Sequence, residues 1–244
     1  MFEIRYYAAT DSPNDDAVPL LGLPESAGLA LWADFQRAGH GRRARNWIAP
    51  PGSSLLVTTL LPRAVASDYL WAVPFWTALG VADGIEAATG IRVALQWPND
   101  LLLAGRKCCG ILCVSRVVGD RAWVGCGTGI NVVRPHGDAA LAAVEPPPAF
   151  LSDRAPHADR RPVLEAILAA YARLLDELDH PNTIARAWER RAELNGTPYR
   201  ILLDGTTEPF EAIALRLEGD GSLIVEHRGA ERRIALADAR VLRG

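Results

Sequence analysis

Hydrophobic residues follow two periods along this chain, and each period predicts a different kind of element. Apolar and β-branched runs at residues 29–33 and 54–61 predict two strands on either side of an arginine-rich segment. Similar runs at 92–96, 110–115 and 121–133 predict three more strands. The first half of the chain is therefore expected to contain a sheet.

Helical spacing appears in three segments of the chain. Residues 67–89 predict a helix, and Pro74 is expected to kink its first turns. A single apolar face is formed by Val163, Leu164, Ile167, Leu168, Tyr171, Leu174, Leu175 and Leu178. That spacing predicts a helix that packs on the core. A further helix is predicted near 184–194, with Gly196 as the residue that ends it.

The pattern changes after residue 196 to short alternating runs separated by turn residues. Turns are predicted at Asp204-Gly205, Asp220-Gly221 and Arg228-Gly229. These features predict a compact antiparallel barrel or sheet and place a domain boundary at Asn195-Gly196. The domains are thus expected at 1–195 and 196–244.

Composition narrows the class of protein. The chain has 244 residues, of which 49% are hydrophobic and 23% charged, so it can bury one substantial core and a small second domain. No signal peptide pattern opens the sequence and no run of eighteen uncharged apolar residues occurs, so we expect neither secretion nor a membrane span. These features favour a cytoplasmic enzyme.

Four cysteines fall between residues 108 and 126. They are Cys108, Cys109, Cys113 and Cys126. The first two are adjacent and cannot easily pair with each other, and the spacing lacks the CxxC pairs of a zinc site. Reduced thiols in a buried strand are therefore predicted, in preference to a metal site.

Lys107 is the only lysine among 26 cationic side chains. An ammonium is a compact point charge on a flexible stem, and a planar guanidinium cannot replace it where one oxygen must be approached closely. Lys107 is thus a candidate functional residue. The alternative is the chance survival of one surface lysine.

A second candidate is the loop at residues 37–47, which holds four arginines, Gly39 and Gly41, with Trp47 behind them. Guanidinium groups and glycine-rich backbone together suit phosphate oxygens. The alternatives are an exposed basic loop without a ligand and a nucleic-acid contact. The net charge of −3 argues against nucleic acid, because no basic field extends beyond the loop.

The third candidate is the glycine-rich segment 125–131, which we interpret as a strand that enters a turn. Its GxGxG spacing, with no helix after it, does not meet the dinucleotide-binding pattern GxGxxG. Glycines at this spacing also permit close approach to a flat ligand, and the amide of Asn131 suits an adenine edge. A simple tight turn is the alternative.

In this order, the motifs resemble those of the biotin protein ligase family. The family's GRGRRGR-x-W loop is similar to residues 39–47, its KWPND…K…GIL segment to 96–112, and its GxGxN turn to 127–131. A weaker match to its Ser-Thr-Asn lies at 12–14. The resemblance implies an α+β fold in which helices flank a mixed sheet, with a small C-terminal SH3-like β-barrel.

The activity that the resemblance implies has two half-reactions. Biotin and ATP, the latter as its Mg²⁺ complex, give biotinyl-5′-AMP, and biotin then passes to one lysine of a biotin carboxyl carrier domain. No tightly bound cofactor is implied. The chain resembles the short type that lacks a DNA-binding domain, so we expect no direct DNA binding and no membrane association, and the resemblance allows a homodimer. The alternatives are an adenylating ligase for lipoate or another carboxylate, and a non-catalytic relative that binds biotin or a nucleotide.

Site residues follow from the matched positions. The three catalytic candidates are Lys107, Arg42 and Asp100. Lys107 is expected to bridge the biotin carboxylate and the α-phosphate, and Arg42 is expected to hold that phosphate. Asp100 is expected to orient Lys107 or the acceptor amine. The expected biotin site comprises Ser12, Pro13, Asn14, Gln36, Gly39, His40, Gly41, Arg42, Trp47, Lys107, Gly110, Ile111 and Leu112. The expected nucleotide site comprises Arg42, Arg45, Trp47, Asn99, Lys107, Gly129 and Asn131. The resemblance assigns no metal ligands.

Several positions depart from the family pattern. Pro13 replaces a threonine, His40 an arginine, Ala44 a glycine, Gln96 a lysine and Val114 a glutamate. The first two fall beside the expected pocket for the ureido ring of biotin. They bear on which acyl substrate is bound, whereas the residues expected to perform the adenylation chemistry are present.

Overall fold

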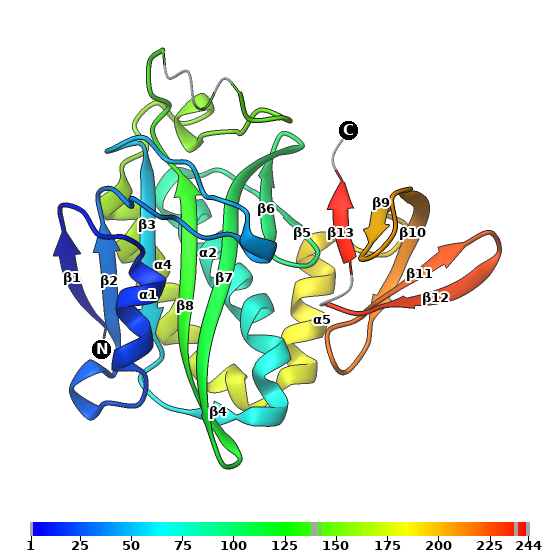
Figure 1. The fold of residues 1–244 in the computed structure, drawn as a ribbon, viewed down its shortest axis with the longest axis horizontal. Helices are drawn as coiled ribbons and strands as arrows, with labels where there is room; N and C mark the ends of the chain where they lie inside the picture. The colour runs from blue at the N-terminus through cyan, green and yellow to red at the C-terminus, as the bar shows by residue number, and fades with distance from the viewer. Residues whose placement is uncertain (1, 138–140, 142, 237–238, 243–244) are drawn as a thin grey trace.

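Two sheets and three long helices make up the computed structural model, which describes residues 2–137, 141, 143–236 and 239–242 (Figure 1). The larger sheet has eight strands, and its main path runs β1-β2-β3-β8-β7-β6-β5. These strands are β1 (Glu3–Tyr7), β2 (Leu29–Ala33), β3 (Ser54–Leu60), β5 (Ala94–Gln96), β6 (Asp100–Leu103), β7 (Arg106–Val118) and β8 (Arg121–Asn131). The eighth strand, β4 (Val65–Ala66), pairs with β8. Because β1 and β2 are parallel and the other pairs antiparallel, the sheet is mixed, as expected.

The long helices lie behind the larger sheet in the view of Figure 1, and the short helix α1 (Pro13–Ala17) lies in front of it. The long helices are α2 (Val73–Thr89), α4 (Arg160–Leu174) and α5 (Pro181–Ala192). The remaining short helical turns are η1 (Val18–Leu20), η2 (Pro24–Ser26), η3 (Arg42–Ala44), η4 (Ser67–Ala72), η5 (Leu151–Asp153) and η6 (Leu175–Asp179). In this view no long helix covers the front face of the larger sheet.

Helix α2 packs closely on α4 because two of its residues lack side chains. A Cβ atom built at Gly80 would lie 2.4 Å from the ring of Tyr171, and one at Gly84 would lie 2.5 Å from Ile167. The Trp76 ring stacks on Tyr171 with a centroid distance of 4.6 Å. The helix predicted over 67–89 is α-helical only from Val73, because residues 67–72 form the 3-10 turn η4. Pro74 therefore lies in the first turn of α2, where a proline ring fits and its missing N–H has no helical partner to lose.

The smaller sheet has five antiparallel strands in the order β12-β11-β10-β9-β13. Their bounds are β9 (Pro198–Leu203), β10 (Phe210–Leu217), β11 (Leu223–His227), β12 (Ala230–Ile234) and β13 (Ala239–Leu242). The antiparallel sheet predicted after residue 196 is confirmed. The described strands form an open path, and no pairing among them closes a barrel.

The two sheets share polar contacts as well as apolar core. The indole Nε1 of Trp97 donates to the carbonyl of Gly221 at 3.1 Å, and its backbone N–H donates to the hydroxyl of Tyr199 at 3.1 Å. Burial raises the pKa of Tyr199 to about 12, so this hydroxyl stays neutral. The smaller sheet is thereby held beside the β5–β6 end of the larger one.

The predicted glycine-rich turn is wrong, because β8 continues as a regular strand through Asn131. Gly125, Gly127 and Gly129 lie at alternate positions of the strand and therefore face the same side of the sheet. In the described part of the chain, no helix has both the length and the hydrophobicity needed to cross a membrane.

Candidate active site

The glycines of β8 form the floor of a cavity on the front face of the larger sheet. A Cβ at Gly127 would lie 2.1 Å from Oδ1 of Asn14, and one at Gly129 would lie 2.7 Å from the Trp47 ring. Gly110 of β7, which pairs with Gly129, has the same ring 2.9 Å from its own Cβ position. Neighbouring side chains therefore occupy the space that Cβ atoms would fill, and this explains the glycines.

Asn14 lies at one end of this floor. Its Nδ2 donates to the carbonyl of Leu112 at 3.0 Å, and its Oδ1 accepts from the hydroxyl of Thr58 at 2.7 Å. The preceding Pro13 occupies the first turn of α1, where a helix has no internal partner for the N–H that proline lacks. Pro13 therefore costs the helix no hydrogen bond.

Cationic side chains gather toward the other end. The Lys107 ammonium lies 2.6 Å from Oδ1 of Asp100 and 5.4 Å from the centroid of the Trp47 ring. Arg42 donates from Nη1 to Oδ1 of Asn99 at 3.4 Å and from Nη2 to the carbonyl of Leu236, which precedes β13. The ends of the cavity thus differ, one carrying an amide and hydroxyls and the other positive charge.

Burial changes the proton affinity of these cations. Loss of hydration lowers the pKa of Lys107 to about 8, and the positive charges of Arg45 and Arg42 act in the same direction. Burial also lowers the pKa of Arg42, with Arg43 and Arg45 contributing. Since the shifted pKa of Lys107 lies close to neutrality, the charge at this end depends on pH in a range where enzymes work.

The cavity has a volume of about 300 Å³. The predicted residues that line it are Ser12, Pro13, Asn14, Gln36, His40, Gly41, Arg42, Arg45, Trp47, Asn99, Lys107, Gly110, Ile111, Leu112, Gly129 and Asn131. Gly39 is not among the lining residues: its carbonyl accepts from the backbone N–H of Trp47, and the Gln36 side chain lies over it. Asp100 also lies outside the lining and reaches the site through Lys107.

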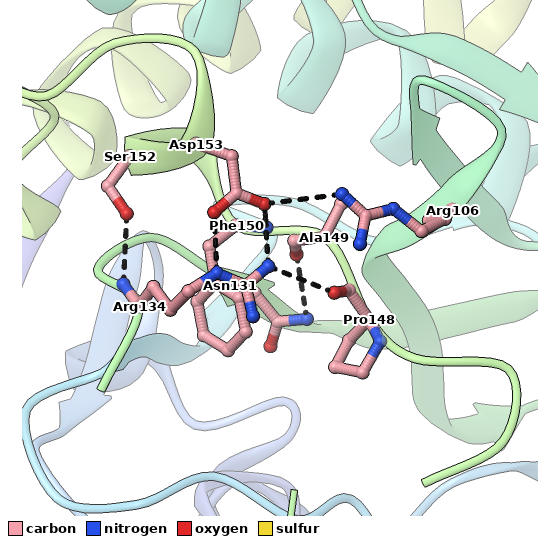
Figure 2. Close-up of polar contacts among 8 residues, drawn as sticks. All are labelled: Arg106, Asn131, Arg134, Pro148, Ala149, Phe150, Ser152 and Asp153. Atoms are coloured by element: carbon pink, nitrogen blue, oxygen red, sulfur yellow. Dashed lines mark hydrogen bonds and ion pairs between the residues drawn. The ribbon is translucent and has the colours of Figure 1, made fainter. Parts of the chain in front are cut away.

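Asn131 does not present a free amide to a ligand, contrary to our expectation that it would read an adenine edge. Its Oδ1 accepts from the hydroxyl of Ser54 at 3.2 Å, and its Nδ2 donates to the carbonyl of Ala149 at 3.2 Å. Figure 2 shows the second of these contacts. Its amide instead holds the chain that follows Pro148 against β8.

The cavity also contains residues that were not predicted to line it. Asn46, Gly127 and Thr128 lie within the matched segments 39–47 and 127–131, and the others are Ile48, Leu56, Val57, Thr58, Leu141, Val144, Glu145, Pro146 and Pro148. Leu56 and Thr58 of β3 lie opposite Gly129 and Gly127, so strand register brings them to the floor. For the lining residues between 141 and 148, the proline-rich run at 146–148 was the one signal that the sequence offered.

Three of the four cysteines are buried, Cys113 is partly buried, and all four are free. Burial raises the pKa of Cys108 to about 12, and burial likewise raises the pKa of Cys109 well above its usual value. The thiols of Cys108 and Cys109 therefore remain uncharged at physiological pH. Among the described residues, no group of three or more His, Cys, Asp or Glu side chains has the geometry of a metal site.

Comparisons with known proteins agree with this geometry. A model of the biotin/lipoate A/B protein ligase family matches residues 11–131. A biotin–[acetyl-CoA-carboxylase] ligase of Paracoccus denitrificans is 35% identical, with 97% of this chain and 99% of that protein aligned. A bifunctional ligase/repressor BirA of Bacillus spizizenii is 32% identical over 86% of this chain, which spans 65% of that protein.

A solved structure, the biotin protein ligase of Aquifex aeolicus in complex with biotin and ATP, shares the fold. Its TM-score is 0.78 at 22% identity, and 99% of each chain is covered. The glycine floor and the cations beside it define a class of protein whose cavity suits a ligand with an anionic end. Within that class, the chain belongs to the biotin/lipoate A/B protein ligase family.

Proposed function

We propose that this chain is an ATP-dependent biotin–[acetyl-CoA-carboxylase] ligase. It forms biotinyl-5′-AMP from biotin and ATP, and it transfers biotin to a lysine of a biotin carboxyl carrier domain. The 35% identity to a relative of that name extends over nearly the whole of both chains. The structural observation that carries the proposal is the position of Lys107 and Arg42 at one end of a glycine floor.

The first half-reaction brings two anions together. An oxygen of the biotin carboxylate attacks the α-phosphorus of ATP, and the bond to the departing pyrophosphate breaks. Positive charge from Lys107 and Arg42 reduces the repulsion as the pentacovalent state forms. Mg²⁺ enters with the ATP phosphates, as it commonly does in nucleotide sites. The ion pair of Lys107 with Asp100 fixes where the ammonium lies.

The second half-reaction needs an amine. The ε-amine of the carrier lysine attacks the carbonyl of the mixed anhydride, an amide bond forms, and AMP leaves as the bond to its phosphate oxygen breaks. Asp100 lies beside Lys107 with only 12% of its side chain exposed. We assign Asp100 to orient Lys107 in the first step, and we propose that its carboxylate accepts a proton of the incoming amine in the second.

The apolar body of biotin fits in the cavity against the Trp47 ring, which itself packs on Gly110 and Gly129 of the floor. We place its ureido ring near Asn14, Ser12 and Gln36, and its valeryl chain along Trp47, so that its carboxylate reaches Lys107. A slot with a few fixed polar groups is typical of sites for such ligands. Nε2 of His40 donates to Oδ2 of Asp15 of α1 at 3.0 Å, and this contact keeps its ring at the cavity rim.

Carrier labelling tests the proposed function directly. The purified protein, with ATP and Mg²⁺, is offered radiolabelled biotin or lipoate and a panel of biotinyl and lipoyl carrier domains. We expect biotin on the biotinyl carrier alone. Label from lipoate at an equal or higher rate would replace the proposal with the lipoate alternative, and binding without transfer would leave a non-catalytic protein.

The pH dependence of adenylate formation is expected to follow Lys107. The charged ammonium is the active form, so kcat/KM should be level below the pKa of about 8 and fall as pH rises through it. The bound substrates are anions and favour the charged form of Lys107, so kcat should fall at a higher pH than kcat/KM. Pyrophosphate release between pH 6 and 10 measures both curves, and a kcat/KM that stays level through pH 9 would contradict the assignment.

Replacement of Gly129 by alanine is expected to weaken biotin binding by about 100-fold, because the new methyl group would displace the Trp47 ring that lies 2.7 Å from its position. Calorimetric titration with biotin measures this change. Gly219→Ala is the matched control, since the nearest atom lies 3.9 Å from its Cβ position. Equal affinities of the two variants would show that Trp47 does not form the roof of the biotin site.

We further propose that residues 196–244 form an SH3-like domain and residues 1–195 the catalytic domain. The meander of β9 to β12, with β13 returning to pair with β9, supports this topology. The contacts of Trp97 with this sheet predict that the two domains unfold together. A single thermal transition detected by both tryptophan fluorescence and circular dichroism would support the last point.

A further inference from the structure

Described residues of the connection between β8 and η5 form one wall of the cavity. The lining residues are Leu141, Val144, Glu145, Pro146 and Pro148, and the wall is defined as residues 144–149. This wall meets the cavity near Lys107, away from Asn14. Its largely apolar surface is of the kind that packs against a purine ring, while the neighbouring cations suit phosphates.

The wall is bonded to the strand that carries Lys107. The backbone N–H of Ala149 donates to the carbonyl of Lys107 at 2.9 Å. On its other side, the carbonyl of Ala149 accepts from Asn131 at 3.2 Å. Ala149 and Phe150 are fully buried, so these bonds are shielded from water. The position of the wall and that of the Lys107 backbone are therefore linked.

Asp153 connects both ends of this segment. Its Oδ1 accepts from Nε of Arg134 at 2.6 Å, and its Oδ2 accepts from Nη2 of Arg134 at 2.7 Å and from the backbone N–H of Phe150 at 3.0 Å. The Arg106 guanidinium, on the residue before Lys107, lies 3.7 Å from the same oxygen. Figure 2 shows this carboxylate between the two guanidinium groups.

Arg134 spans the segment from its start to its end. Its Nη2 also donates to the carbonyl of Pro148 at 3.3 Å, and its guanidinium lies 4.6 Å from the centroid of the Phe150 ring. Its backbone N–H donates to the Ser152 hydroxyl at 2.9 Å. A bidentate pair restricts orientation as well as distance, so these contacts hold the wall in one place.

Asp153 is ionised throughout the working range of the protein. Hydrogen bonds from Arg134 lower the pKa of its carboxyl group, against an opposing effect of burial. Its side chain is 18% exposed, whereas that of Arg134 is 44% exposed. A partly buried carboxylate that accepts several charge-assisted bonds is costly to disturb.

We propose that Asp153 and Arg134 are positioning residues of the ligase reaction, which hold the wall at 144–149 against Lys107 and so shape the nucleotide end of the cavity. The identity of the nucleotide rests on the proposed function. Neither residue lines the cavity, so their effect on ATP passes through the backbone at Ala149.

Asp153→Asn, which keeps the shape of the side chain and removes its charge, tests the proposal. We expect the Kd for α,β-methylene ATP and the KM for ATP in biotin-dependent pyrophosphate exchange to rise about tenfold, equivalent to about 1.4 kcal/mol. The KM for biotin should not change. Hydrogen exchange at the Ala149 amide should become faster. Arg134→Gln should have the same three effects.

Matched variants separate positioning from general stability. Glu231→Gln removes the carboxylate of an exposed bidentate pair with Arg216, at 2.9 Å for both contacts in the smaller sheet, and should change none of these quantities. Asp153→Glu keeps the charge and should recover most of the affinity for ATP. The proposal fails if Asp153→Asn leaves the nucleotide Kd and the Ala149 exchange rate as they are, or raises both KM values equally.

The same measurements distinguish this failure from that of the proposed function. A wild-type protein that shows no biotin-dependent exchange would refute the ligase activity. In that case the Kd for the ATP analogue and the exchange rate at Ala149 still decide whether Asp153 positions the wall.

Discussion

Replacing Lys107 by alanine is expected to slow adenylate formation by about 10³-fold, the scale on which loss of one preorganised charge slows other enzymes. Lys107→Arg should be nearly as slow. The Nζ atom of Lys107 lies 2.6 Å from Oδ1 of Asp100 and 5.4 Å from the centroid of the Trp47 ring, and a planar guanidinium cannot place one compact charge in the same position. Pyrophosphate release with biotin and ATP measures both variants.

Two controls accompany this prediction. Lys107→Ala removes the ammonium that pairs with the buried carboxylate of Asp100, so the double variant with Asp100→Asn shows whether the loss comes from that carboxylate. Arg116→Gln removes another cation of β7, one that contacts the carbonyl of Leu21, and should retain the wild-type rate. Near-normal rates in both Lys107 variants would make this lysine an ordinary surface residue.

Arg42→Gly is expected to release the adenylate before transfer. If Arg42 holds the α-phosphate, its loss should let biotinyl-AMP escape and acylate bystander proteins, raising the biotin detected on added albumin by at least tenfold, a loss of about 1.4 kcal/mol in retention. The protein itself offers little target for such labelling, because Lys107 is its only lysine.

Arg43→Gly is the matched control for this experiment. Arg43 has a left-handed backbone with φ of 60°, which glycine adopts readily, and its side chain pairs with Asp204 of the smaller sheet instead of lining the cavity. It should leave albumin unlabelled. Albumin labelling that does not rise in Arg42→Gly, with adenylate still being formed, would show that another group retains the intermediate.

Elements with a strong local pattern were predictable from the sequence. The continuous apolar runs that form β2 and β3 are buried, and so is most of the apolar stripe along α4. Burial on this scale produces runs and spacings of hydrophobic residues that are clear in the sequence. The strand β1 was missed because it lies at the sheet edge and is mostly exposed. The short β6 was missed because the two-residue turn after it, at Ala104 and Gly105, was not recognised; both have positive φ, as tight hairpins require.

Prediction from the sequence was limited in a different way at the candidate active site. Motif residues such as Arg42 and Lys107 were identified because their chemistry is visible in one segment of sequence. The turn at 125–131 was wrongly predicted because glycines interrupt many strands. Here the glycines continue a strand, and the space of their absent side chains is filled by Asn14 and Trp47, which are distant in sequence. Pairings such as that of Arg134 with Asp153 depend on where the chain returns, which no local pattern records.

The glycine floor also bears on how this protein can change during evolution. Its surface is main chain, and any side chain added at Gly127 would meet the Leu112 carbonyl at 2.4 Å. Mutation therefore has almost no means of adjusting the floor toward a new acid without disrupting the sheet. Adaptation to a different substrate would have to occur around the floor, at lining residues such as Pro13 and His40, which already differ from the family pattern. Selection acting on those positions can alter which acid is accepted, while the surface beneath the ligand stays the same.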